Sequence, residues 1–158
     1  MVLNPLVATT HFHLIYATRD LTGVEVFKDA ERSAMDEMEA RRAEAQRRNR
    51  TERSGQSELG LFGRREDPKS DHYTQLRERY LRKARDGVRR MLTQQGCVLF
   101  DDVWAYALAA PLTWDHDVKG WLTEWKKEGL LTIEGLREGK RVPKLRQGVN
   151  LVWRTGQR

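Results

Sequence analysis

The feature that most constrains this chain is the part of it in which apolar residues recur at regular spacing. From residue 71 onward, apolar side chains three and four residues apart indicate a long amphipathic helix that ends at Gly96. They are Leu76, Tyr80, Ala84, Val88, Met91 and Leu92. Residues 39–70 show no comparable pattern, so a compact core is expected over only part of the 158-residue chain.

The segments after this helix follow a definite order. Residues 97–100 form a short β-prone run, and a second helix follows until Pro111 stops it. Thr113 is expected to cap a third helix that Gly129 closes, and two strands then occupy residues 130–133 and 149–153. This is the element order of a winged helix-turn-helix domain, which we assign to residues 71–155.

The first 48 residues are expected to form a strand followed by a helix. Residues 11–17 are rich in aromatic and β-branched side chains, which favours a strand. After Gly23, apolar residues at helical spacing continue to Met38 and then give way to arginines, so the helix is expected to end near Arg48. Residues 49–70 combine turn-forming and charged residues without a period, which is typical of a flexible linker.

Together these segments predict an α+β protein that is mostly helical. It consists of a strand–helix arm over residues 1–48, a basic linker over 49–70 and the winged helix-turn-helix domain over 71–155. Both faces of the strand at residues 11–17 are partly apolar, as in an internal strand of a covered sheet. We expect a second copy or another protein to complete the sheet at residues 11–17, or the strand to fray in the monomer.

Charge is distributed unevenly along the chain. The net charge is +6, of which residues 1–40 carry −4, residues 41–95 carry +8 and residues 96–158 carry +2. A basic region of this kind favours a polyanionic partner, most often nucleic acid. An arginine-rich surface that serves only solubility is the alternative, and charge alone does not separate the two.

The third expected helix has two distinct sides. Its apolar side carries Val118, Trp121, Leu122 and Trp125. Its opposite side gathers residues that can donate hydrogen bonds to phosphates or base edges: His116, Lys119, Thr123 and Lys127. Gly120 lies among them, and close approach of a partner would explain a glycine there. This side lacks Arg, Asn and Gln, so weak sequence specificity is expected; a solvated polar side is the alternative.

The loop between the last two strands adds cations beside this helix. The candidate phosphate contacts in it are Arg137, Lys140, Arg141 and Lys144. A solvated basic turn is the alternative interpretation. The arginines of the helix at 71–95 are interpreted mostly as a solvated face, and the spacing of the tryptophans predicts that they belong to the core rather than to a base-stacking surface.

Catalytic and metal-binding chemistry find little support in the sequence. His11 and His13 are two residues apart, but no further ligand completes a metal set, so no metal, cofactor or catalytic residue is expected. The single cysteine, Cys97, excludes an internal disulfide. No apolar run reaches the ~20 residues of a membrane span, and no signal peptide is evident, so a cytoplasmic, non-membrane protein is expected.

Residues 10–19 (THFHLIYATR), followed by Gly23 and an amphipathic helix, resemble a segment late in the three-Cys-motif partner proteins. That family also ends in a winged-helix-type domain, where residues 71–155 would fall. In the family a methyltransferase-like α/β domain precedes this strand, whereas Met1 here lies ten residues before it. The resemblance therefore implies a C-terminal fragment or split-gene product, with no catalytic or cofactor residue to carry over.

The resemblance also implies a partner protein with a three-cysteine radical-type motif, and association with phages or mobile elements. Our leading hypothesis is a weakly sequence-specific nucleic-acid-binding module, favouring duplex DNA, that is accessory to a DNA- or RNA-acting partner. One alternative is a protein–protein interaction module of the three-Cys-motif partner system. Another is a methyltransferase-like subunit that is active only with a partner; the chain alone is not expected to be an enzyme.

Overall fold

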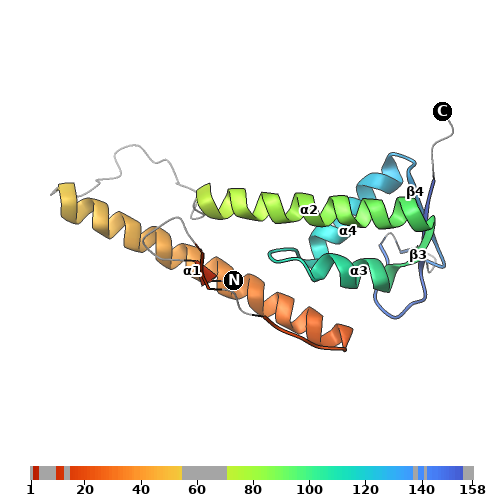
Figure 1. Cartoon of the computed structure of the whole chain (residues 1–158), viewed down its shortest axis with the longest axis horizontal. Coiled ribbons are helices and arrows are strands. Elements are labelled where there is room, and N and C mark those ends of the chain that lie inside the picture. The colour runs from red at the N-terminus through yellow and green to blue at the C-terminus, as the bar shows by residue number, and fades with distance from the viewer. Residues whose placement is uncertain are drawn as a thin grey trace.

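The computed structural model describes residues 2–3, 10–12, 15–54, 71–136, 139–140 and 142–154. Over these residues the protein is α+β and mostly helical, as predicted (Figure 1). The helices are α1 (Leu21–Ser54), α2 (Asp71–Gln95), α3 (Phe100–Leu108) and α4 (Asp115–Lys127). The strands are β1 (Val2–Leu3), β2 (Thr10–Phe12), β3 (Cys97–Leu99), β4 (Leu131–Glu134) and β5 (Asn150–Trp153).

The main core lies between α2, α3, α4 and the sheet that β3, β4 and β5 form. The inner side of α2 contributes Val88 and Leu92, both without exposed surface. Trp104 of α3 and Trp125 of α4 are each only 1% exposed in this core. Burial of such large side chains provides most of the hydrophobic stabilisation of a small domain.

The three-stranded sheet is antiparallel, and β5 is its central strand. Leu151 of β5 lies opposite Val98 of β3 on one edge and Ile133 of β4 on the other. Figure 1 shows this sheet beside the end of α2 at which the helix stops. Gly96 adopts φ +71° there, so the predicted end of the helix is confirmed.

The ends of α4 confirm one sequence prediction and correct another. Gly129 closes the helix with φ +75°, as expected. Thr113 is not the N-cap, because its hydroxyl donates to the Pro111 carbonyl at 3.4 Å. Trp114 is the N-cap residue, and its backbone N–H donates to the Asp117 carboxylate at 2.9 Å. A side chain inside the helix thus satisfies the free N–H group.

The helix α1 continues to Ser54, so the expected end near Arg48 is wrong. Ion pairs one helical turn apart support the preceding stretch up to Arg48, in which apolar periodicity has already vanished. Arg41 pairs with Glu37, and Arg48 pairs with Glu44, each at 2.8 Å. Such exposed pairs stabilise a helix by only a few tenths of a kcal/mol each, but they act together over the polar half of α1.

The helix α1 packs against the rest of the chain through a small second cluster. Met35 of α1 lies there with Tyr73 of α2 and Leu112, the residue with φ +55° between α3 and α4. Nearby, the buried Lys28 ammonium donates to the Ala110 carbonyl at 2.9 Å. These contacts attach the arm to the start of α2 and the turn after α3.

The N-terminal strand differs from the prediction for residues 11–17. The strand β2 covers Thr10–Phe12 and pairs with β1, whereas residues 15–18 have no regular secondary structure and residues 13–14 lie outside the described part of the chain. The Tyr16 ring stacks on Phe27 of α1, with ring centroids 4.5 Å apart. This contact holds the backbone around Tyr16 against the helix rather than in a sheet, which explains why the strand ends earlier.

Candidate nucleic-acid interface

The inner side of α4 matches the prediction. Val118, Trp121, Leu122 and Trp125 are all buried in the main core. The Trp125 ring meets Trp153 of β5 edge-on, with centroids 5.4 Å apart. The opposite side of α4 is therefore the one available to a partner.

Two aspartates at the start of α4 are structural. The Arg77 guanidinium of α2 donates to both oxygens of Asp117, at 2.8 and 3.0 Å. The indole N–H of Trp104 donates to Asp115 at 3.0 Å. Acidic residues also suit the first turn of a helix electrostatically. These carboxylates are therefore engaged in holding α4 in place rather than free for chemistry.

The four candidate residues on the outer side of α4 differ in availability. The His116 side chain is 58% exposed, although its Nε2 lies 3.4 Å from Asp117 Oδ1, and Lys127 is exposed as well. Lys119 is half-buried and forms an ion pair with Asp115, four residues before it. The Thr123 hydroxyl donates to the Lys119 carbonyl at 2.8 Å. His116 and Lys127 are thus the more available of the four.

The loop between β4 and β5 places part of its charge in solvent. Lys140 and Lys144 are exposed, while Arg137 and Arg141 lie outside the described residues. Arg146 is engaged elsewhere, since its guanidinium pairs with Asp20 at 2.7 Å. The pKa of Asp20 is lowered, chiefly by the Thr22 backbone N–H and also by Arg146.

A second set of cations lies along α2, where the sequence favours mostly a solvated face. Two of them are bound to α4: Arg77 to Asp117, and Arg85 to Glu124 at 2.7 Å. Five others are exposed and have no carboxylate within ion-pair distance in the described part of the chain: Arg79, Arg82, Lys83, Arg89 and Arg90. We name these five residues the α2 cationic stripe.

The α2 cationic stripe could have been found in the sequence. Arg82 and Lys83 lie three and four residues after Arg79, and Arg89 and Arg90 follow two turns later on the same side of the helix, opposite the apolar stripe. The sequence alone does not reveal which cations neighbouring helices neutralise. Only the fold separates Arg77 and Arg85 from the five that remain in solvent.

Other site chemistries find no support among the described residues. There, no three His, Cys, Asp or Glu side chains lie close enough together to hold a metal ion, and His11 and His13 have no described side chains. All five tryptophans are buried, which confirms their assignment to the core. No helix in the described ranges is both long and apolar enough to cross a membrane.

Comparison with known proteins adds no relative. No family model, curated protein or solved structure matches this chain. The three-Cys-motif resemblance of residues 10–19 therefore stays a hypothesis. The case for a function rests on the chain's own geometry and charge.

Proposed function

We propose that this protein is a nucleic-acid-binding module of the winged helix-turn-helix type. The element order α2–β3–α3–α4–β4–β5 and the sheet order β3–β5–β4 support this assignment. In such domains the helix in the position of α4 enters the major groove, and the loop in the position of β4–β5 lies beside it. Duplex DNA is the partner that this arrangement favours.

The observation that carries the proposal is the polar, partly cationic outer side of α4. His116 and Lys127 are exposed there, while every large apolar residue of the helix is buried. Lys140 and Lys144 are exposed in the adjoining loop. Lys119, Thr123, Arg137 and Arg141 complete the proposed contact set. Cations of this kind contact phosphates, and the lack of Arg, Asn or Gln on α4 limits base reading.

An accessory role follows from the weak specificity. A module that holds phosphates but reads few bases can deliver a DNA- or RNA-acting partner to its substrate. A protein of the three-Cys-motif partner system, in the cytoplasm of a phage- or mobile-element-bearing host, is the partner that the resemblance of residues 10–19 supports. The catalytic step would then belong to that partner.

The test is duplex binding measured across a salt series with an α4–loop variant. This variant carries Lys119→Gln, Lys127→Gln, Lys140→Gln and Lys144→Gln. The slope of log affinity against log salt should fall by about 0.9 for each phosphate that the variant no longer neutralises. Wild-type protein that binds neither duplex nor single strands at about 50 mM salt, where such contacts are strongest, would contradict the proposal.

Protein docking is a second candidate, which exposed apolar residues on the arm favour. Ile15 is 88% exposed and Val26 is 65% exposed. A cavity of about 520 Å³ opens nearby between residues 15–20, α1 and α3. Sedimentation of the wild type and of an Ile15→Asp, Val26→Asp variant tests whether a second copy covers this region: self-association only in the wild type would support it.

A further inference from the structure

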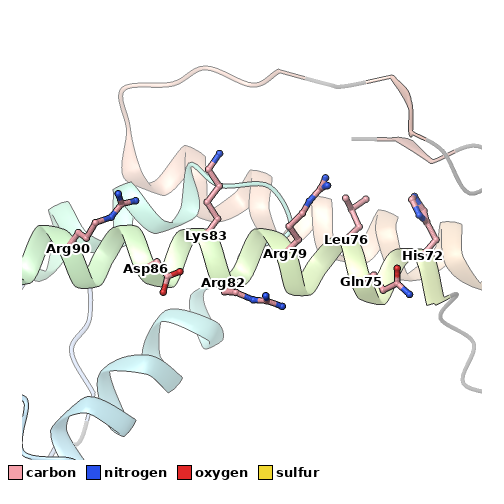
Figure 2. Close-up of a pocket in the computed structure, with 8 residues that line it drawn as sticks. All are labelled: His72, Gln75, Leu76, Arg79, Arg82, Lys83, Asp86 and Arg90. Atoms are coloured by element: carbon pink, nitrogen blue, oxygen red, sulfur yellow. The ribbon is translucent and has the colours of Figure 1, made fainter.

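The outward side of α2 borders a shallow groove of about 640 Å³, and all the described residues that line it belong to this helix. Figure 2 shows the eight side chains that line it, with Arg79, Lys83 and Arg90 on one side of the helix axis and Arg82 on the other. A second hollow follows toward the end of the helix, where Arg89 joins Arg90. The α2 cationic stripe borders both hollows.

The charge of this surface is strongly one-sided. Among the described residues that line the two hollows, five exposed cations accompany a single carboxylate, Asp86. From Arg79 to Arg90 the stripe extends about 16 Å, at 1.5 Å per residue. Four of the five cations are arginines, whose planar guanidinium groups match phosphate oxygens in a bidentate way.

We propose that the α2 cationic stripe is a second nucleic-acid-binding surface that contacts phosphates separately from α4 and the β4–β5 loop. This second surface depends on the proposed function only in that its partner is taken to be nucleic acid. The ion pairs of Arg77 with Asp117 and of Arg85 with Glu124 lie between the two surfaces. Each surface therefore has its own set of cations available to phosphates.

The composition of the stripe favours nucleic acid over a membrane. A helix that lies on a lipid surface inserts apolar side chains beside its cations. Among the described residues that line the groove, the one large apolar residue is Leu76, which is 8% exposed and packs in the second cluster with α1. A linear row of arginines without apolar anchors instead suits the regularly spaced charges of a phosphate backbone.

The experiment compares three full-length variants that each remove four positive charges. The α2 variant carries Arg79→Gln, Arg82→Gln, Lys83→Gln and Arg90→Gln. The α4–loop variant is the one described above. The control carries Arg19→Gln, Arg32→Gln, Arg47→Gln and Arg53→Gln, all exposed residues on α1 or just before it. Duplex affinity is measured by fluorescence anisotropy over a salt series, with circular dichroism to verify folding.

The α2 variant should lower the salt slope by about 0.9 for each phosphate that it no longer neutralises, while the control stays near the wild type. An α2 variant that behaves like the control overturns this inference and leaves the α4–loop proposal to its own variant. If the α4–loop variant binds like the control and the α2 variant does not, the proposed contact set on α4 and the β4–β5 loop is wrong. The α2 cationic stripe is then supported by itself. Binding to phosphatidylserine vesicles but not to duplex overturns it in favour of a membrane.

A gain-of-function variant gives a result that misfolding does not produce. Asp86→Lys replaces the lone carboxylate between the cations with one more cation on an exposed helix position. Duplex binding should become tighter, and the salt slope should steepen by about 0.9 if the added ammonium group reaches a phosphate. Unchanged affinity in a folded Asp86→Lys protein would argue against phosphates at this surface.

Discussion

Gly120 lies in the middle of α4, on the side that the proposed function gives to nucleic acid. A Cβ atom at this position would meet nothing within 4 Å, and its φ is not positive. Gly120→Ala should therefore stabilise the helix by about 1 kcal/mol, because glycine has the greater conformational entropy to lose. For a small domain this raises Tm by about 4–8 °C, which differential scanning calorimetry would detect.

The same substitution distinguishes a structural glycine from one that admits a partner. If a duplex approaches the α4 backbone closely, Gly120→Ala should weaken duplex binding while raising Tm. Gly129→Ala is the matched control, since φ +75° at that position makes any side chain strained, and its Tm should fall. A Gly120→Ala protein with an unchanged or lower Tm would contradict the prediction.

Among single residues, spacing predicted which side chains are buried but not which charges pair. The burial of Trp121 and Trp125 follows from helical periodicity, which is a local property. The contact of Arg146 with Asp20 joins residues 126 positions apart. No local pattern encodes such a contact.

Between elements, the packing of α1 on α2 places a tyrosine hydroxyl in a buried position. Burial raises the pKa of Tyr73 to about 12 from its ordinary value of 10; Arg77 opposes the shift, and Asp36 and Glu39 add to it. Because the folded-state pKa is the higher one, the stabilisation is complete below pH 10 and is lost as the pH rises through 12. The shift corresponds to about 3 kcal/mol.

Tyr73→Phe should remove this pH dependence. Its loss of Tm between about pH 10 and 12 should be smaller than that of the wild type, because no phenolate forms at this position. Tyr106→Phe is the matched control, at a tyrosine that is 46% exposed. An equal loss of Tm for wild type and Tyr73→Phe over this pH range would contradict the burial of the Tyr73 hydroxyl.

The pairing of β1 with β2 gives a separate prediction for the N-terminal strand. The pair joins Val2 to Phe12 and Leu3 to Thr10, and a two-stranded sheet of this length is marginal in water. Amide hydrogen exchange in dilute monomer should therefore be fast across Thr10–Phe12 and slow at Leu151 in the central strand. Strong protection of Thr10–Phe12 in the monomer would argue against a partner that completes this sheet.

The elements that the sequence predicted best are the helices that end at a glycine. Glycines at 96 and 129 take positive φ and end α2 and α4 where expected. The end of α1 was missed because the helix continues beyond Arg48 through residues that carry no apolar period. The strand β1 was missed because two residues are too few to show an alternation of apolar and polar side chains.

At the scale of the whole molecule, the two clusters of buried residues are very unequal. The main core draws only on residues between Ala84 and Trp153, with Leu21 and Val24 of α1 at its margin. The second cluster is small, and in the described part of α1 Met35, which is 3% exposed, is the one buried residue that belongs to it. Residues 71–154 should therefore be the source of most of the stability, and the arm an addition to them.

A chain shortened to residues 71–158 should consequently fold by itself. Its unfolding should stay cooperative, with a lower Tm because Tyr73 and Leu76 lose the cover of Met35. It should also keep the wild-type salt slope for duplex binding, since both proposed cationic surfaces lie within it. Met35→Asp in the full chain is the companion variant, because it releases α1 without deleting it. A cooperative fold whose salt slope is halved would instead place phosphate contacts on α1.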